Sequence, residues 1–247
     1  MTENQDLKLQ LLDKFANIEK PETVDFCKAA FEWLVTEPII AKPCTVRDGI
    51  ANGPCGVMEE LPDGIYYVLA DGNVVPFIPD MGVDGSLDGS QVRYVGIKWG
   101  SRSLKVALHD AADGEEITLT SNKDITKYDG YKDNYLDAVA DWNGKANTEH
   151  LKAIGLSKEI VLADGEYIPS LGEMYLIYLN RKALNQALEL IGSEPIKDDW
   201  YWTSTECIAT GAWFLYLYLG FANGYAKASS TLHVRPVSAF IIYSLVS

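Results

Sequence analysis

Several residue types are scarce in this chain, and their scarcity argues against several classes of protein. The 247 residues include four cysteines and three histidines, and the cysteines show no C-x-x-C spacing. Neither a zinc site nor a dense disulfide framework is therefore indicated. Lysine and arginine number 21 against 35 acidic residues, which gives a net charge of −14. Because such a chain repels phosphate backbones and anionic membrane surfaces, we expect no nucleic-acid partner.

Long apolar runs are also missing. No stretch approaches the roughly 20 consecutive apolar residues that cross a bilayer, so we expect no membrane insertion. The start of the chain, Met1 to Asp6, is polar and lacks the basic and apolar regions of a secretion signal. We therefore expect no signal peptide.

Residues that could bind metal or catalyse a reaction are scattered rather than grouped. The histidines lie in three different segments without ligand spacing: His109, His150 and His233. Three aspartates in a glycine-rich loop do not match the EF-hand pattern, and we interpret them as solvated turn residues: Asp80, Asp84 and Asp88. No P-loop, G-x-S-x-G or H-E-x-x-H motif occurs. We therefore expect no metal, no cofactor and no enzymatic activity.

The pattern of apolar residues indicates an α+β fold. A helical lead-in is expected over residues 1–42, and a β-rich region over 43–125. In that region, β-type runs separated by Asp-Gly and Gly-Ser turns occur at 65–69, 74–78, 92–99, 104–108 and 117–119. Beyond it the pattern predicts a short helix through Leu151, a longer helix after Ser170, and strands again over 201–240. The order of helix, sheet, two helices and sheet is typical of α+β folds.

The longer helix has recognisable ends. Ser170 and Glu173 have capping-box spacing, and Gly192 is placed to end the helix in a left-handed conformation. Between them runs an apolar stripe: Leu176, Leu179, Ala183, Leu184, Ala187, Leu188 and Ile191. We expect this stripe to pack against the C-terminal sheet, because neither element can otherwise bury its apolar face.

The segment 207–233 is unusual in composition. Its single charged residue is Lys227, although 23% of the whole chain is charged. From Trp213 onward the residues alternate, so that aliphatic side chains fall on one face and Phe214, Tyr216 and Tyr218 fall on the other. The aromatic face could be covered by a helix or could bind a ligand. After Gly220 no strand or helix period is visible, which favours loops.

Four short segments resemble one family of proteins: 168–173 (IPSLGE), 201–206 (YWTSTE), 212–213 (AW) and 234–237 (VRPV). They resemble bacterial and phage proteins with the formylglycine-generating-enzyme type of C-type lectin fold, and more narrowly the variable proteins of diversity-generating retroelements. The resemblance covers about 130–240 and extends loosely to 64–120. It implies a C-type lectin-like domain over 126–247, with antiparallel sheets and two helices, preceded by the helical and β-rich regions.

The same resemblance implies a receptor-binding or adhesin module. A fixed frame would hold the hypervariable segment 207–233, whose codons are rewritten by adenine-directed mutagenesis. Altered AAC codons cannot encode Trp, Met, Gln, Glu or Lys, and only Trp213 and Lys227 of these types occur there. We therefore expect a scaffold of Ala212, Trp213, Leu215, Leu217, Gly220 and Lys227. The candidate variable, ligand-binding positions are Cys207, Gly211, Phe214, Tyr216, Tyr218, Leu219, Phe221, Gly224, Tyr225, Ala226, Ala228, Ser229, Thr231, Leu232 and His233.

Within this set we expect an exposed aromatic face with Trp202, Trp213 and Arg235 beneath or beside it: Phe214, Tyr216, Tyr218, Phe221 and Tyr225. The ligand would be a protein or glycan on a target cell surface. Release of a phage tail by lysis would fit the polar start of the chain, and exposure on a cell surface after release is the other localisation left open. An oligomer formed through the N-terminal region is compatible with this reading.

Two alternatives stay open, namely a bacterial lectin with a fixed ligand and an enzyme of the formylglycine-generating type. That enzyme needs a pair of functional cysteines, whereas Cys207 is the single cysteine in the lectin-like half. Calcium-dependent sugar binding needs a Glu-Pro-Asn or Gln-Pro-Asp loop, which the sequence lacks.

Overall fold

The computed structural model describes residues 58–59, 61–78, 87–122, 130–240 and 244–245. The chain divides into two compact units, and the first consists of Met1–Cys55 with Gly100–Arg102. The helices predicted for 1–42 lie outside the described residues, as do Asp80 and Asp84. The second unit, Gly56–Trp99 with Ser103–Ser247, contains the features discussed below, apart from Arg102.

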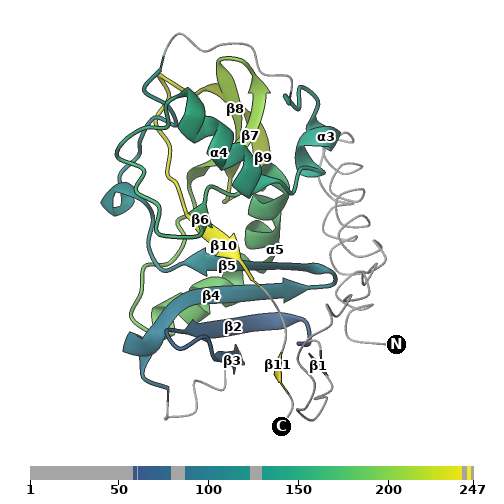
Figure 1. Cartoon of the computed structure of the whole chain (residues 1–247), viewed down its shortest axis with the longest axis vertical. Coiled ribbons are helices and arrows are strands. Elements are labelled where there is room, and N and C mark those ends of the chain that lie inside the picture. Colours follow the sequence, from purple (N-terminus) through teal and green to yellow (C-terminus); the bar gives the residue numbers. More distant parts are fainter. Residues whose placement is uncertain (1–57, 60, 79–86, 123–129, 241–243, 246–247) are drawn as a thin grey trace, which may run out of the picture. The chain divides into compact units, whose positions relative to one another are not determined.

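The larger sheet of this unit has six strands in the order β3-β2-β4-β5-β10-β6 (Figure 1). Its strands are β2 (Gly64–Leu69), β3 (Val74–Phe77), β4 (Val92–Trp99), β5 (Arg102–Ala107), β6 (Glu166–Tyr167) and β10 (Val237–Ala239). Four of the five β-type runs predicted before residue 120 are thereby confirmed. The fifth is not a strand, because Ile117 forms an isolated bridge to Leu232.

The smaller sheet has three antiparallel strands in the order β7-β8-β9. Its strands are β7 (Trp200–Ile208), β8 (Gly211–Tyr216) and β9 (Phe221–Ala226). The expectation of loops after Gly220 is wrong for residues 221–226, which pair along their whole length with β8, whereas residues 227–233 form no helix or strand. A short pair, β1 (Met58–Glu59) with β11 (Ser244–Leu245), completes the described strands.

The described helices are α3 (Tyr135–Val139), α4 (Gly144–Ile154) and α5 (Leu171–Leu190), with 3-10 turns at Gly89–Gln91 and Ala112–Gly114. The sequence predicted α4 and α5 but not the single turn of α3. None of the described helices combines the length and apolarity that a bilayer crossing requires. The α+β class with antiparallel sheets is confirmed.

Helix α5 begins and ends as its sequence predicts. The Ser170 hydroxyl accepts a hydrogen bond from the Glu173 N–H, and the Glu173 carboxylate accepts one from the Ser170 N–H at 2.7 Å, so the capping box is complete. At the other end Gly192 has φ +71°, a left-handed conformation that favours glycine. The Ser193 N–H returns to the Leu188 carbonyl at 2.9 Å and closes the helix.

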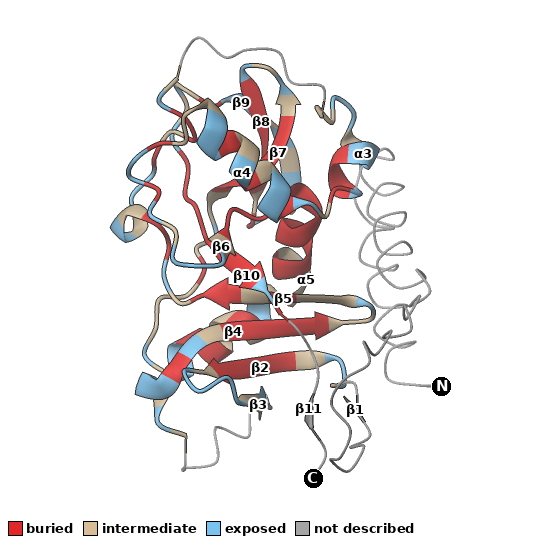
Figure 2. Cartoon of the chain, in the orientation of Figure 1, coloured by how far each residue is buried: buried red, intermediate tan, exposed pale blue. Residues whose placement is uncertain are grey.

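Helix α5 packs against strands of both sheets, namely β2 and β4 of the larger and β7 and β8 of the smaller. Figure 2 shows most of its first half as buried. Leu176, Leu184 and Leu188 of the predicted stripe are buried. Leu179 is exposed, so its place in the stripe is wrong. The predicted packing of the helix against the C-terminal sheet is confirmed by its contacts with β7 and β8, but it is incomplete, because the same helix also contacts β2 and β4 of the larger sheet.

A core cluster holds the smaller sheet to the loops and to α4, which contacts β7. It contains Trp202 and Phe214 from the sheet, Leu151 from α4, and Ile117 and Leu232 from the two bridged segments. The predicted β-rich region 43–125 and lectin-like region 126–247 contribute strands to one six-stranded sheet. The division between those regions stays a prediction.

Candidate ligand-binding face

Cross-strand register assigns the side chains of the smaller sheet to two faces. Trp200 lies opposite Tyr216, and Tyr216 opposite Phe221, so these three point to the same side. By the same register Trp202 and Phe214 share that side, as does Tyr225 opposite Ala212. We call this set the aromatic face: Trp200, Trp202, Phe214, Tyr216, Phe221 and Tyr225. The opposite face carries Tyr201, Trp213 and Leu215.

The centre of the aromatic face is a stack of rings. The Trp200 ring is stacked on Phe214 with centroids 4.8 Å apart and on Tyr225 with centroids 5.4 Å apart, each at an interplanar angle of 21°. The Phe214 and Tyr225 centroids are 4.5 Å apart. Since Phe214 retains only 1% of its exposure, it is a core residue beneath the other two rings. The expectation that Phe214 faces solvent is wrong.

Exposed apolar side chains lie in the β8–β9 turn and along the edge strand β9. The exposed fractions are 59% for Tyr218, 64% for Leu219, 48% for Phe221 and 38% for Tyr225. We call these four residues the exposed rim. Tyr216, half-buried, joins the rim to the stack, because its ring lies 5.3 Å from Trp200 and 6.0 Å from Tyr218. Large aromatic and aliphatic side chains are thus exposed to solvent next to a set of packed aromatic rings.

The other candidate positions divide by burial. Ala226, Ser229 and Thr231 are exposed, and Cys207, Gly224 and Ala228 are half-buried. Gly211, Leu232 and His233 are buried, so the expectation that they face solvent is wrong for them as for Phe214. The reason is backbone pairing: Gly211 lies in the central strand, and Leu232 and His233 bridge to Ile117 and Tyr201. Whether any candidate position varies or binds a ligand stays a prediction.

Most of the positions that we expect to form scaffold lie in the interior of the protein. Ala212, Trp213, Leu215, Leu217 and Lys227 are buried. The Trp213 indole donates to the Lys132 carbonyl at 2.7 Å, and its ring lies 5.7 Å from that of Tyr135 in α3. Gly220 has φ +68°, and a Cβ there would come within 2.6 Å of the Tyr178 ring. Glycine is therefore the residue that this turn accepts.

Lys227, the one charged residue of segment 207–233, is fully buried in an ion pair. Its ammonium group pairs with one oxygen of the Glu206 carboxylate, and His150 Nε2 lies 3.2 Å from the other oxygen. The Lys227 N–H also donates to the Thr210 carbonyl at 3.0 Å. The charge is therefore removed from the surface of the segment. The sequence identified Lys227 as scaffold but not Glu206 as its partner, since nothing in their spacing indicates that the two meet.

Arg235, which follows segment 207–233, forms a second buried ion pair. Its guanidinium Nε lies 2.6 Å from Asp110 Oδ1, and Nη1 donates to the Ala107 carbonyl at 3.1 Å. The Tyr201 hydroxyl donates to Asp110 Oδ2 at 3.0 Å. Burial raises the pKa of Asp110, and the Arg235 charge acts against that rise. Both partners are fully buried, so Arg235 contributes nothing to the surface, and its predicted place beneath or beside the aromatic face stays a prediction.

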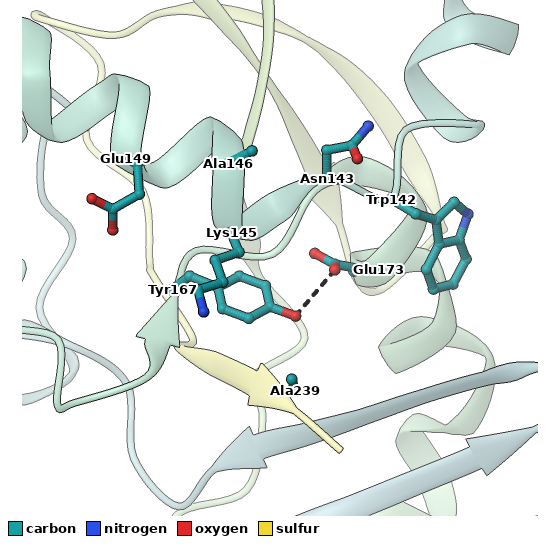
Figure 3. A pocket seen from close by; sticks show the side chains of 8 residues that line it. All are labelled: Trp142, Asn143, Lys145, Ala146, Glu149, Tyr167, Glu173 and Ala239. Carbon is teal, nitrogen blue, oxygen red and sulfur yellow. Dashed lines mark hydrogen bonds between the residues drawn. The ribbon is translucent and has the colours of Figure 1, made fainter. Parts of the chain in front are cut away.

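A separate pocket of about 480 Å³ lies between α4, the β6–β10 edge and the start of α5 (Figure 3). It is lined by Trp142, Asn143, Lys145, Ala146, Glu149, Tyr167, Glu173 and Ala239. Burial raises the pKa of Glu173 to about 7, and the Tyr167 hydroxyl donates to this carboxyl group at 3.2 Å. Glu173 already caps α5, so its place in the pocket has a structural explanation. We therefore favour the aromatic face as the candidate site.

Comparison with known proteins adds one structural neighbour. No protein-family model matches the chain, and no curated protein matches it in sequence. Among solved structures it is similar to a fimbrial protein from Bacteroides ovatus ATCC 8483, with a TM-score of 0.52 and 16% sequence identity. The match covers 73% of this chain and 49% of that one, so the chain spans about half the length of its neighbour. At this identity the likeness shows a shared β-rich α+β fold.

Proposed function

We propose that this chain is a non-enzymatic ligand-binding protein of the adhesin type, which contacts its target through the exposed rim. The observation that carries the proposal is the exposure of Tyr218 and Leu219 in the β8–β9 turn and of Phe221 and Tyr225 on the edge strand β9. Clustered apolar side chains on a strongly acidic chain are a liability unless they serve a contact. Tyrosine and other aromatic residues also dominate the energetic centres of protein interfaces.

The layer beneath the rim supports this function. Binding is tighter when the contact residues are already held in their bound positions, because less conformational freedom is lost. Tyr225 is held by Trp200 and Phe214, and the turn before Phe221 is fixed by the hydrogen bond from the Tyr175 hydroxyl to the Gly220 carbonyl at 3.0 Å. Phe221 and Tyr225 of the rim are therefore held on a paired strand, and Tyr218 and Leu219 lie in the turn to which this hydrogen bond attaches.

In finer detail, we propose a C-type lectin-like fold whose segment 207–233 is diversified by a retroelement. Five of the six scaffold residues are buried and most candidate variable positions are not, which is the distribution that such diversification requires. The ligand that we favour is a protein on a target cell surface, because the rim combines aromatic rings and tyrosine hydroxyls with the aliphatic Leu219. A glycan is the second candidate, since the exposed tyrosine rings could stack on a sugar.

The enzyme alternative is weaker on chemical grounds. Cys207 is a half-buried free thiol, and burial raises its pKa above the ordinary value. A raised pKa lowers the fraction of nucleophilic thiolate at neutral pH. We therefore expect Cys207→Ser to leave fold and redox behaviour unchanged, and loss of an oxidase activity in that variant would restore the enzyme alternative.

The binding proposal is tested with the fluorescently labelled full chain on intact bacterial cells, measured by flow cytometry. A rim variant (Tyr218→Ser, Phe221→Ser and Tyr225→Ser) should lose binding. A matched control carries three serines at other exposed apolar positions, Leu136, Val161 and Leu190, and should bind like the wild type. Treating the cells with trypsin should abolish binding to a protein, whereas loss only after periodate would indicate a glycan. Equal binding by both variants would refute the proposal.

Diversification is tested on the DNA. The coding region for residues 207–233 should have a near-copy beside a reverse-transcriptase gene, and the two copies should differ only where the near-copy has adenine. A genome without such a copy would leave a fixed-ligand adhesin or lectin.

A further inference from the structure

Three side chains that are far apart in the sequence converge beside the aromatic face. One ligand atom from each of Glu116, Asp199 and His233 lies within 4.8 Å of the other two. We propose that these residues form a binding site for a single divalent transition-metal ion, with Zn²⁺ as the best-suited occupant. The proposal concerns residues outside the exposed rim and does not depend on what the rim binds.

The backbone fixes the three positions relative to one another. The Ile117 N–H donates to the Leu232 carbonyl at 2.9 Å, and the Leu232 N–H returns to the Ile117 carbonyl at 3.1 Å. The His233 N–H donates to the Trp200 carbonyl at 3.0 Å. His233 is therefore itself in a backbone hydrogen bond, and Glu116 and Asp199 directly precede residues that are. These backbone hydrogen bonds hold the three segments together. Metal sites depend on such rigid support.

The side-chain geometry suits coordination better than an ion pair. Asp199 Oδ1 accepts from the Trp200 N–H at 2.8 Å, which leaves Oδ2 facing His233 Nε2 at 3.6 Å. That separation is long for a hydrogen bond. Two ligand atoms that each lie about 2.1 Å from a tetrahedral zinc ion are roughly 3.4 Å apart, so the spacing fits a shared ion. Glu116 Oε2 faces the Thr231 hydroxyl at 3.4 Å, a contact of the kind that orients metal ligands from outside.

The imidazole supplies an independent observation. His233 is only 6% exposed, and its Nδ1 is buried with no hydrogen-bond partner. The other ring nitrogen, Nε2, forms no hydrogen bond within the described part of the chain, and it faces Asp199 Oδ2 at 3.6 Å. Burying a polar ring without partners is unfavourable. Coordination through Nε2 would give the ring one polar partner, on the nitrogen that faces Asp199, and would leave Nδ1 as it is.

The charges at the site also call for a cation. Two carboxylates lie close together, and no lysine or arginine in the described part of the chain forms an ion pair with Glu116 or Asp199. One imidazole nitrogen with two carboxylate oxygens suits zinc and its neighbours among the transition metals, whereas Ca²⁺ and Mg²⁺ prefer oxygen ligands alone. Three protein ligands leave a fourth position for water or an external group.

The test is isothermal titration of the EDTA-treated, dialysed full chain with ZnCl₂ at pH 7.5. One equivalent should bind, and thermal stability should rise with Zn²⁺ concentration. Lowering the pH to 5.5 should weaken binding, because protons compete for the ligand atoms.

Variants locate the site. Glu116→Gln and Asp199→Asn should each weaken Zn²⁺ binding at least tenfold, and Glu116 is exposed, so that variant is expected to fold. Glu115→Gln, a change at the neighbouring exposed carboxylate, should bind like the wild type. Absence of Zn²⁺, Co²⁺ or Mn²⁺ binding would overturn the proposal, as would binding that is unchanged in both Glu116→Gln and Asp199→Asn.

Discussion

Strands β8 and β9 are neighbours in one hairpin, are equally long and are both uncharged, yet they differ in burial. Five of the six residues of β8 are buried, whereas none of β9 is. Strand β8 is the central strand of its sheet and has partners on both sides, whereas β9 is at the edge. Phe214 is therefore core, whereas Phe221 on β9 is half exposed although it shares the same face. Position in the sheet, more than residue type, decides which aromatic groups can meet a ligand.

The largest expected effect is on stability, and it tests whether β8 and β9 differ in burial. Phe214→Ala and Trp213→Ala should each lower the free energy of unfolding by roughly 3 to 5 kcal/mol, because each truncates a buried ring. Phe221→Ala should lower it by less than about 1 kcal/mol, since its ring is already half in water. Urea denaturation of the three variants measures the difference. A loss for Phe221→Ala as large as that for Phe214→Ala would mean that β9 is core.

The next prediction concerns the buried charge at the end of the hairpin. Lys227→Met should lower the free energy of unfolding by about 3 kcal/mol, because the Glu206 carboxylate would be left buried without its main partner. Adding Glu206→Gln to this variant should recover part of the loss. If the double variant is less stable than Lys227→Met alone, the carboxylate has other partners and the pair is not its main compensation.

Helix α5 shows the same contrast between buried and exposed positions in two glutamates, since Glu173 is buried and Glu189 is exposed. The pKa of Glu173 rises from 4.5 to about 7 on folding, so the folded chain holds a proton that the unfolded chain releases between these values. Stability from this group is therefore complete below pH 4.5 and is lost as the pH rises through 7. At about 1.4 kcal/mol for each pKa unit, the loss should be roughly 3 kcal/mol.

Chemical denaturation from pH 4.5 to 8 measures this dependence. Glu173→Gln should flatten the profile relative to the wild type, because an amide does not titrate, whereas Glu189→Gln should leave it unchanged. A slope that persists in Glu173→Gln would assign the titration to another buried group, such as Asp110.

The smallest expected effect on stability is at the rim. Tyr218→Ala should change the free energy of unfolding by less than about 0.5 kcal/mol, because its side chain is mostly in water. Its effect on cell binding should be much larger than its effect on stability. Tyr216→Ala should fall between the core and rim variants, since Tyr216 is half-buried against Trp200. If both tyrosine variants melt like Trp213→Ala, the binding face has to be abandoned.

Much of the fold follows from local sequence signals. The capping box of Ser170 and Glu173, the stop at Gly192 and four β-type runs each depend on residues close in the chain. Strand β9 could not be found in this way, because Phe-Ala-Asn-Gly-Tyr-Ala has no clear alternation and becomes a strand through pairing with β8. Leu179 shows the same limit, since its helical spacing is correct but none of the described elements buries it.

The candidate site was predictable in outline and not in detail. The alternating pattern of side chains correctly placed Phe214 and Tyr216 on one face of the strand. Burial changes along that face, however, because Phe214 is in the core whereas Tyr218 is exposed. Trp200 was missed, although strand spacing from Trp202 would have placed it on the same face. The partners of Lys227 and His233 lie far away in the sequence, so their contacts depend on the tertiary fold.

The burial of Lys227 also affects how fast the chain can meet a partner. With its one charge neutralised inside, segment 207–233 has no surface charge to attract or repel at short range. The net charge of −14 comes from the rest of the sequence. Its electrostatic effect is long-range and is weakened by dissolved salt. Toward an acidic cell surface, the association rate should therefore rise with ionic strength, while the dissociation rate, set by uncharged contacts, should stay nearly constant.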